Sequence, residues 1–492
     1  LLIALYVAAL ITAFNPPQSP PLVNIPIFFA ITKSIFITLI GAFVAFAFLS
    51  TNVFIHLVTL PLEFDASFKR ALPILQKYVP KENLQQCKSV LKAAALTYVA
   101  GSIVSIFAMR RIFVTILPFI RMLLLFVSFI VLKDTKIFFA SYDVFFKNSK
   151  FIIFFKLLAI YGSIASIIIS INFFKELKLS RFEIPILILF ATLGMMVLIS
   201  SNNLMVMYLG IELQGLSLYV LAAIQRDSIK SAESGIKYFV LGALSSGILL
   251  YGCSLIYGFT GNTNFEEIKI ALNSLDKLNI GILFGLIFVL VGLAFKISAA
   301  PFHMWTPDVY EGAPTSITAF FAIVPKVSAI ALIYRFCLEP FADFYNDWRQ
   351  IVIFLSLTSM FVGAFAAIVQ TNIKRLLAYS SIGHIGYALI GLASSNSEGV
   401  KGVIIYMFIY VLMNIGIFSI ILSVKLKDKY IENISDLSGL SKKKPLYSLC
   451  IAILMFSMSG IPPFAGFFGK FYIFIAALEA DLIFLAVLGV IS

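Results

Sequence analysis

Four charged residues stand in the middle of long apolar stretches of this sequence: Glu212, Lys296, Lys326 and Lys470. A charge at the centre of a bilayer costs about 2.5–3.5 kcal/mol on insertion scales, so such residues need a partner, water or a function. Burial disfavours the charged form of a lysine, whereas a nearby carboxylate favours it. A carboxylate that moves toward or away from a buried lysine therefore loads or unloads its proton. These residue types indicate proton transfer along a row of buried groups.

Each of the three lysines lies near a proline in the sequence. Proline removes a backbone donor and clashes with the carbonyl four residues back, and broken helices at membrane depth occur where they line water or protein. We therefore interpret the lysines as ion-path residues, with snorkelling toward the interface as the alternative. For Glu212 the alternative is a structural carboxylate bound to a neighbouring helix. We predict helix breaks at four prolines: Pro301, Pro325, Pro462 and Pro463.

Two histidines are weaker proton-path candidates. His303 lies close to Pro301, where it either relays protons or binds a freed carbonyl, and His384 lies in the middle of an apolar stretch. The sequence contains no CxxC pair, no Cys/His cluster, no nucleophile triad and no phosphate-binding loop. We therefore expect no catalytic residue, metal or cofactor in this chain.

The composition is that of a membrane protein. The chain has 492 residues, of which 61% are apolar and 12% charged, with a mean hydropathy of +1.01. A soluble chain is about half apolar and a quarter charged. The net charge of +13 would suggest nucleic acid binding in a soluble protein, but most basic residues lie in short loops between apolar runs.

Runs long enough to cross a bilayer, about 17–25 residues, follow one another along the chain. Segment 62–90 is polar, and residues 133–150 are mixed. Partial runs occupy 1–14 and 482–492, and we expect the C-terminus to be incomplete. The other predicted spans are 34–60, 91–109, 112–132, 151–173, 182–200, 203–224, 235–258, 279–304, 314–338, 350–370, 376–393, 400–424 and 446–480.

The loops after residue 173 alternate in charge. Those near 175–181, 225–237, 371–375 and 425–444 are rich in Lys and Arg, whereas the intervening loops near 259–278, 339–350 and 394–402 hold only four such residues. Basic loops remain on the cytoplasmic side of a membrane. We therefore assign the basic loops to the cytoplasm or the mitochondrial matrix.

Two proline-interrupted segments, 279–311 and 446–480, occur in the two halves of the region after residue 181. Paired broken helices of this kind point to an inverted-repeat transporter. We predict a first repeat at 182–338 and a second at 350–492. A leading helix and basic loop at 151–181 precede them, after an N-terminal membrane extension over 1–150 that contains the polar loop.

Several stretches around these residues resemble the antiporter-like subunits of respiratory complex I, of the type called N in bacteria and subunit 2 in mitochondria. They are YLGIELQGLSLYVLAA, SGIKYFVLGALSSGILLYG, FKISAAPFHMWTPDVYEGAPTSITAFFAIVPKVSAIA, IKRLLAYSSIGHIGYALIGL and SGIPPFAGFFGKFY, and they cover roughly 180–480.

The resemblance implies an all-α polytopic fold of about fourteen helices, with two inverted five-helix repeats that each contain a discontinuous helix. It also implies that Glu212 and Lys296 form a pair that modulates proton affinity, and that Lys326 and Lys470 continue the path. The expected function is proton translocation as a subunit of NADH:ubiquinone reductase. NADH, FMN, iron–sulfur clusters and ubiquinone belong to other subunits.

The resemblance further implies that the partners are other membrane-arm subunits, including related antiporter-like ones, and lipids, without nucleic acid. The expected location is the mitochondrial inner membrane, or the plasma membrane if the source is prokaryotic. Two alternatives remain: a subunit of a cation/proton antiporter, which uses the same fold, and a structural membrane scaffold whose lysines are inert.

Overall fold

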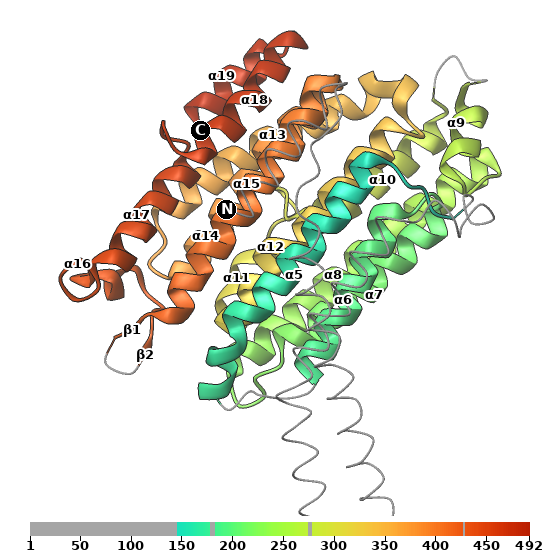
Figure 1. The fold of residues 1–492 in the computed structure, drawn as a ribbon. Helices are drawn as coiled ribbons and strands as arrows, with labels where there is room; N and C mark the ends of the chain where they lie inside the picture. Colours follow the sequence, from blue (N-terminus) through green and yellow to red (C-terminus); the bar gives the residue numbers. More distant parts are fainter. Residues whose placement is uncertain (1–144, 178–182, 274–277, 427–428) are drawn as a thin grey trace, which may run out of the picture. The chain divides into compact units, whose positions relative to one another are not determined.

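Long helices that run side by side make up nearly all of the structure, a computed structural model that describes residues 145–177, 183–273, 278–426 and 429–492 (Figure 1). All statements on the fold concern these ranges, which lie within one unit of the chain, Leu117–Ser492. The predicted extension over residues 1–150, including its polar loop, lies almost entirely outside them. The prediction of an all-α membrane fold agrees with the observed helices at the level of fold class.

The first half of the described chain contains α5 (Lys150–Glu176), α6 (Glu183–Ser200), α7 (Leu204–Ala222), α8 (Ile229–Thr260), α9 (Phe265–Asn273), α10 (Ile280–Ile297), α11 (Trp305–Gly312) and α12 (Thr315–Leu338). The second half contains η2 (Ala342–Phe344), α13 (Tyr345–Ile368), α14 (Ile373–Ser394), α15 (Ser397–Ser423), η3 (Ile434–Leu437), α16 (Leu440–Lys443), α17 (Pro445–Ser459), α18 (Ala465–Glu479) and α19 (Ile483–Ile491). Two very short antiparallel strands, β1 (Lys425–Leu426) and β2 (Lys429–Tyr430), form a hairpin after α15.

Nine of these helices are long and apolar enough to cross a membrane, counted over the described ranges only. Side-chain caps define where several of them begin. The side chains of Asn203, Asn279 and Asn372 accept hydrogen bonds from the backbone N–H groups that follow them, at the starts of α7, α10 and α14. The positions of these helices match the predicted spans, although α8 begins six residues earlier than predicted.

Two of the predicted interruptions are confirmed. Helix α10 ends at Ile297, Ser298 adopts a left-handed backbone conformation (φ 64°), and α11 begins at Trp305 after the turn that contains Pro301. Helix α17 ends at Ser459, and α18 begins at Ala465 beyond Pro462 and Pro463. In both cases, a lysine of interest lies within a few residues of the interruption.

The predicted break at Pro325 is wrong, because α12 continues through this residue. A proline is tolerated inside a membrane helix where neighbouring groups satisfy the freed backbone. Here the carbonyl that loses its donor belongs to Phe321, and the Tyr410 hydroxyl donates to the adjacent Ala322 carbonyl at 2.9 Å. This bond from a neighbouring helix supports the backbone next to the proline, and the helix continues.

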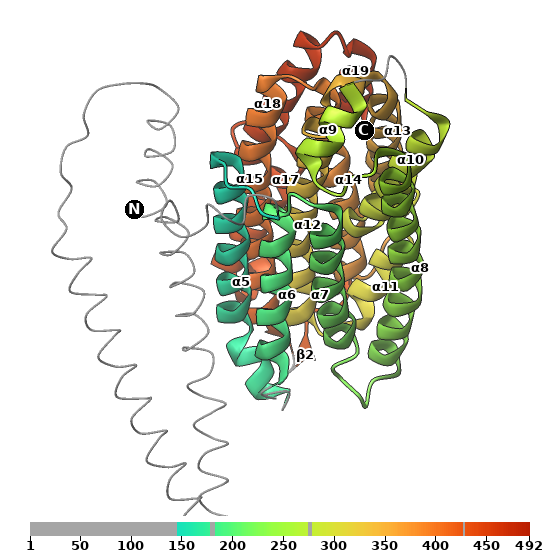
Figure 2. The same ribbon diagram turned by 90° about the vertical axis from the view of Figure 1, so that its right-hand side faces the viewer.

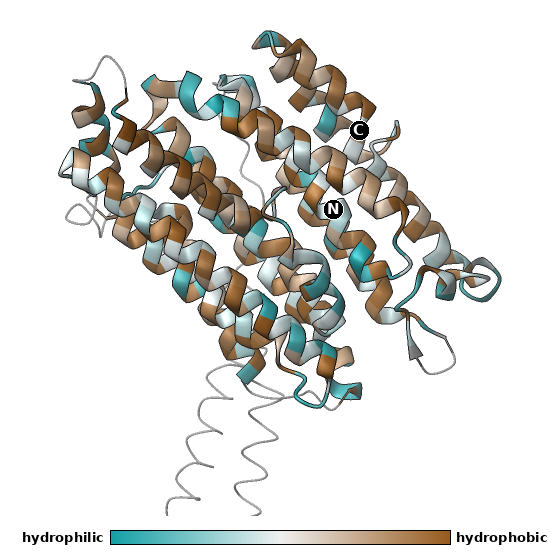
Figure 3. Cartoon of the chain, turned by 180° about the vertical axis from the view of Figure 1, so that it is seen from behind, coloured by the Kyte–Doolittle hydropathy of each residue, from teal (hydrophilic) through white to brown (hydrophobic). Residues whose placement is uncertain are grey.

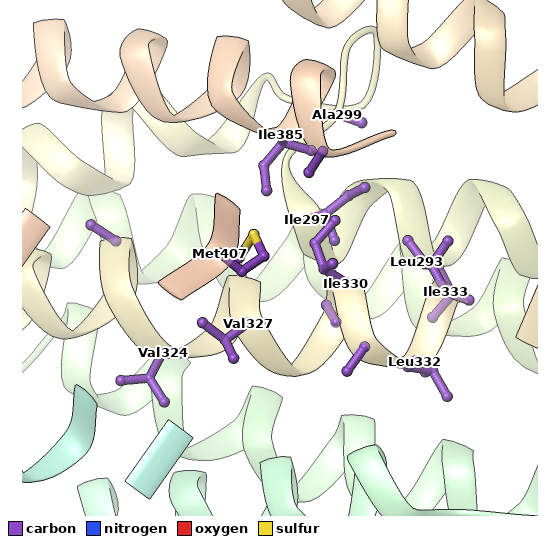
Figure 4. Packing of buried hydrophobic residues seen from close by; sticks show 14 of the residues in the cluster. Leu293, Ile297, Ala299, Val324, Val327, Ile330, Leu332, Ile333, Ile385 and Met407 are labelled. Atoms are coloured by element: carbon purple, nitrogen blue, oxygen red, sulfur yellow. The ribbon is translucent and has the colours of Figure 1, made fainter. Parts of the chain in front are cut away.

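Helix α12 forms the centre of the bundle. Every residue from Thr315 to Cys337 is buried, and α5, α6, α10, α14 and α15 pack around it. Figure 4 shows apolar side chains from several of these helices together, among them Ile297 of α10, Ile330 of α12, Ile385 of α14 and Met407 of α15. A charge on α12 is therefore surrounded by protein.

The outer helices present apolar side chains outward. Along α8, residues such as Ile236, Leu244 and Tyr251 are more than half exposed. Hydrophobic residues cover much of the length of the long helices, and hydrophilic ones gather mainly toward helix ends and loops (Figure 3). Figure 2 shows α5, α6, α7 and α8 in a row along one side of the bundle. This pattern is expected where lipid is the solvent.

Candidate functional site

The first candidate lysine, Lys296, lies on the last turn of α10 and is 8% exposed. Its Nζ donates a hydrogen bond of 3.2 Å to the hydroxyl of Tyr219 on α7. The same ammonium lies 5.7 Å from the centre of the Tyr219 ring, within the range of a cation–π contact. A phenol, rather than a carboxylate, is thus the direct partner of this lysine.

Glu212 lies near the middle of α7, as predicted, but it does not touch Lys296. None of the ion pairs of the described residues joins these two side chains, and the Glu212 Oε1 atom is inaccessible to solvent and has no hydrogen-bond partner. Helix α7 packs closely on α6 because Gly194 and Gly210 face each other's backbones. The expected glutamate–lysine pair is therefore an indirect one, with Tyr219 on the same helix between its members.

Lys326 lies in the middle of the buried helix α12 and is 1% exposed. Its Nζ donates a hydrogen bond to the hydroxyl of Ser381 on α14. The ammonium also lies 5.6 Å from the ring centre of Tyr310, which belongs to α11. Three different helices thus meet around this one charge.

His384 and Lys470 lie in the second half of the described chain. His384 is 5% exposed, and its Nδ1 is 2.6 Å from the hydroxyl of Tyr406 on α15. The charges of Lys470 and Lys326 both act on His384. The Nζ of Lys470 donates to the Ser459 carbonyl at 3.1 Å and lies 4.2 Å from the ring centre of Tyr387. The histidine therefore lies within the electrostatic reach of both lysines.

His303 is not part of this group of contacting residues. Its half-buried ring packs near Tyr379 at 6.4 Å, and its Nδ1 has no hydrogen-bond partner. No contact between His303 and the candidate lysines is seen in the described part of the chain. His303 remains a prediction near a helix break, without a neighbour that would assign it a role.

Sequence reasoning missed the residues that contact the candidate groups directly. Four of them contact the lysines, namely Tyr219, Tyr310, Ser381 and Tyr387, and Tyr406 contacts His384. Tyrosine and serine are common at helix contacts and at membrane interfaces, so their presence in an apolar run does not distinguish them. The one sequence feature that could have indicated such a residue is a tyrosine among small residues. Tyr219 follows Gly215 by four residues, and it also fits against Gly242 of α8.

An ionic cluster holds the short helix α11 between the two halves of the described chain. Asp308 binds Lys237 of α8 at 2.7 Å and Arg375 of α14 at 2.8 Å, and Glu311 binds Lys230 at 3.0 Å and Arg375 at 3.1 Å. These groups line a cavity of about 160 Å³. The cluster fixes the helix that carries Tyr310.

The buried residue Lys374 attaches the same helix from a second direction. Its Nζ donates hydrogen bonds to the carbonyl of Glu311 and, at 3.0 Å, to that of Ala313. These carbonyls lie at the C-terminal end of α11, where backbone acceptors lack partners within the helix. Lys374 therefore acts as a cap for α11.

A larger cavity of about 1160 Å³ opens at this end of the bundle. It is lined by the end of α5, the start of α8, the junction between α11 and α12, and the segment from Lys425 to Lys443. At its edge the Tyr430 hydroxyl donates to the Glu176 carboxylate; burial and this carboxylate raise the pKa of Tyr430 to about 12. The walls combine lysines with carboxylates, so the cavity suits water and ions.

The described residues hold no group of three His, Cys, Asp or Glu side chains that could bind a metal. Residues 9–117, which all precede the described part of the chain, match the sequence profile of the putative neutral zinc metallopeptidases. The chain has three histidines, His56, His303 and His384, and none belongs to an HExxH motif. This match falls on the segment that we predicted to be a membrane extension.

Residues 201–492 match the profile described as NADH:quinone oxidoreductase/Mrp antiporter, transmembrane. NADH-quinone oxidoreductase subunit N of Parvibaculum lavamentivorans is 57% identical over 339 residues, which are 69% of this chain and 70% of that protein.

Two solved structures resemble the chain. A chain of respiratory complex I from Thermus thermophilus with bound Aureothin has a TM-score of 0.61 at 29% identity, and the match covers 89% of this chain and 86% of that one. A chain of the Mrp complex from Dietzia sp. DQ12-45-1b has a TM-score of 0.69 at 24% identity, covers 80% and 74%, and indicates a shared fold. The profile match over residues 201–492 agrees with the buried lysines and the helix breaks. This chain therefore belongs to the NADH:quinone oxidoreductase/Mrp antiporter family of membrane proteins.

Proposed function

We propose that the chain is a proton-translocating membrane-arm subunit of NADH:quinone oxidoreductase, and that protons move through Glu212, Lys296, Lys326 and Lys470. The observation that carries the proposal is that three lysines of the apolar bundle each lie against a tyrosine ring, with Lys296 and Lys326 buried and Lys470 partly buried. The high identity to subunit N of a bacterial relative supports the assignment to this enzyme. The NADH, FMN, iron–sulfur and ubiquinone chemistry belongs to other subunits.

The environment of the lysines suits reversible protonation. Burial of an ammonium in a low dielectric costs free energy and favours loss of its proton. The protonated form of each lysine is therefore stabilised only by the few groups that contact it. Lys326 has one hydroxyl and one aromatic face as partners, and Lys296 has one phenol and its ring. A small change in a nearby charge is therefore enough to move a proton.

The second half of the path runs from Lys326 toward Lys470. Ser381 and His384 lie one turn apart on α14, so the serine that binds Lys326 is adjacent to the histidine. His384 contacts Tyr406, whose ring is 6.5 Å from that of Tyr387, the aromatic partner of Lys470. We assign His384 to the relay between the two lysines, and we leave His303 outside it.

We also propose the finer architecture expected from the family: about fourteen helices in two inverted five-helix repeats. The matching order of elements supports it. Helices α6, α7, α8, α10/α11 and α12 correspond to α13, α14, α15, α17/α18 and α19, with the broken helix fourth in each set. The first two helices of each set also pack extensively on each other.

The sidedness of the loops is part of the proposal. Lys230, Lys374, Lys425 and Lys443 come from three separate loops that the charge pattern assigned to one side, and all four line the large cavity. Their convergence supports a basic face toward the cytoplasm, or toward the matrix in a mitochondrial inner membrane. The partners are then the neighbouring membrane-arm subunits, including related antiporter-like ones, and lipids.

Lys296→Met tests this function in the whole complex reconstituted into vesicles. Methionine preserves the length and apolar stem of the side chain but cannot carry a proton, so we expect the assembled complex to lose proton pumping and coupled NADH:quinone turnover. Lys401→Met is the matched control, because Lys401 is exposed and pairs only with Glu398 on its own helix. Pumping by the Lys296→Met complex at the Lys401→Met level would favour an inert scaffold.

A cation/proton antiporter subunit is the second candidate, favoured by the fold shared with the Mrp complex of Dietzia. The two candidates differ in what they assemble with. Purification of the tagged chain should recover NADH-oxidising subunits under the proposed function. Recovery of a complex without NADH oxidation that exchanges cations for protons would support the antiporter.

A further inference from the structure

Two polar groups on α7 lack the partners that their chemistry requires. The Glu212 Oε1 atom is an acceptor without a donor. The Tyr219 hydroxyl accepts a hydrogen bond from Lys296, and none of the described hydrogen bonds uses its own hydrogen. The buried hydroxyl of Ser246 on α8, which also forms none of these hydrogen bonds, lies beside it and is oriented as a donor to the phenol oxygen. We propose that the Tyr219 hydroxyl, with one water above Gly215, carries the proton between Lys296 and Glu212. This inference rests on the proposed function and adds a residue that touches the transferred proton.

The helix geometry directs the tyrosine toward the glutamate. Residues seven apart lie on the same face of a helix, and long side chains lean toward the N-terminus of their helix. Tyr219 follows Glu212 by seven residues, so its hydroxyl leans back over the turn between them. A Cβ atom at Gly215, in that turn, would lie 3.1 Å from the Tyr219 hydroxyl oxygen.

The absence of a side chain at Gly215 leaves space next to both polar groups. The same Cβ position is 3.5 Å from the Nζ of Lys296. A side chain at this position would press on the phenol and approach the ammonium, so glycine lets the two groups meet beside this turn. The proposed water bridges the phenol to Glu212, which supplies one of the polar partners that an ordered water needs.

A second glycine fixes the tyrosine hydroxyl in place. A Cβ atom at Gly242 of α8 would be only 2.2 Å from the Tyr219 hydroxyl oxygen, so no other residue leaves room for this hydroxyl without moving the ring. Tyr238 and Phe239 of α8 pack edge-on against the Tyr219 ring at 4.7 and 5.8 Å. The position of the phenol is therefore determined by helix packing.

Electrostatic interactions also link Glu212, Tyr219 and Lys296. The charge of Glu212 acts on both Tyr219 and Lys296, although it forms no ion pair with the lysine. In the transfer, an N–H bond of Lys296 breaks as its proton bonds to the Tyr219 oxygen, and the phenol releases its own proton to the water. The water passes one of its protons to Glu212, so that neutral lysine and neutral glutamic acid result while phenol and water are regenerated.

Only part of this arrangement recurs in the second half of the described chain. Lys470 of the broken helix α17/α18 lies over the ring of Tyr387 of α14, as Lys296 of the broken helix α10/α11 lies over the ring of Tyr219 of α7. The Tyr387 hydroxyl, however, donates to the Gly489 carbonyl at 3.3 Å, and Lys470 donates to the Ser459 carbonyl. Within the described residues, the hydrogen bond from a lysine to a phenol oxygen is therefore specific to Tyr219.

Tyr219→Phe in the reconstituted complex tests the inference. The substitution removes one oxygen and keeps the packed ring, so assembly should be unchanged, while coupled proton pumping should fall on the order of a hundredfold, the low end of what a positioned proton-transfer group contributes. Tyr238→Phe is the matched control, because it removes a buried phenol oxygen next to Tyr219 that contacts no candidate lysine. Lys296→Met is measured alongside.

Gly242→Ala gives a second measurement if Tyr219→Phe fails to assemble. The added methyl displaces the hydroxyl without removing it, and the same loss of pumping is expected. Pumping equal to that of Tyr238→Phe in both variants would overturn the role of Tyr219. If Lys296→Met is inactive in the same experiment, the proposed function survives that result; if Lys296→Met pumps normally, the proposed function itself fails.

Discussion

At the scale of single residues, the candidate path is defined by what each lysine touches. Lys296 and Lys326 each donate to one hydroxyl, from Tyr219 and Ser381, and Lys470 donates to a backbone carbonyl. An ammonium has three donors, so each of these lysines is under-satisfied by protein alone. Such groups exchange protons more readily than lysines in complete ion pairs.

Ser381→Ala should weaken pumping through Lys326. The substitution removes the hydroxyl that accepts from the Lys326 Nζ and leaves the ammonium with only an aromatic face. We expect coupled turnover to fall several-fold in an assembled complex, because the charged form of the lysine loses its stabilising partner. Proton pumping per NADH oxidised, measured in vesicles, checks this.

The adjacent residue Ser380 is the control for this experiment. Its hydroxyl contacts only the Met458 sulfur, at 4.0 Å, and it lies on a different side of α14. Ser380→Ala should pump as the unmodified complex does. Equal losses in the two serine variants would mean that α14 is merely sensitive to small substitutions, and the special role of Ser381 would be abandoned.

At the scale of elements, the sequence predicts the interruptions well where a proline coincides with a change of direction. Pro301, Pro462 and Pro463 lie in such turns, whereas Pro325 lies inside a continuous helix. The difference depends on Tyr410, which belongs to α15 and donates to the Ala322 carbonyl. A compensating donor from a distant segment cannot be recognised in a local sequence pattern.

The clamp on α11 is also invisible in the sequence, and it gives an element-scale prediction. Lys374→Met should destabilise the assembled complex by about 1–3 kcal/mol, because two buried carbonyls at the end of α11 lose their donor. Lys230→Met should cost less than about 1 kcal/mol, because its ion pair with Glu311 is largely exposed on the lysine side.

Thermal inactivation of the purified complex measures both effects in the same assay. The exposed and buried lysines belong to one cluster and undergo the same substitution, so the difference isolates the backbone cap. A larger loss of stability in Lys230→Met than in Lys374→Met would refute the assignment of Lys374 as the cap of α11.

At the scale of the whole molecule, apolar runs and loop charges are enough to predict a helical membrane protein, because lipid exposure acts on every long helix in the same way. The partners of the lysines were not predictable, because they come from helices whose contacts depend on the complete bundle. Tyr310, for example, reaches Lys326 only because α11 is attached to both α8 and α14. For the same reason, the absence of an ion pair between Glu212 and Lys296 was not predictable from the sequence.

The sidedness predicts a labelling pattern. Lys443→Cys, at the basic end of the bundle, should react with a membrane-impermeant maleimide from the cytoplasmic or matrix side only, and Lys401→Cys from the opposite side only. Cys253 and Cys337 are buried and should contribute little background. Labelling of both positions from the same side would invalidate the assignment of the loops.

The complete burial of α12 has a consequence for how the protein is made. Ribosomes synthesise α12 before α13, α14 and α15, so Lys326 reaches the translocon before its partner Ser381 enters the membrane. A nascent chain that ends at Leu338 would present this lysine to lipid, at a cost of about 2.5–3.5 kcal/mol. Helix α12 is therefore expected to remain at the translocon, or with a membrane chaperone, until the second half of the bundle arrives to enclose it.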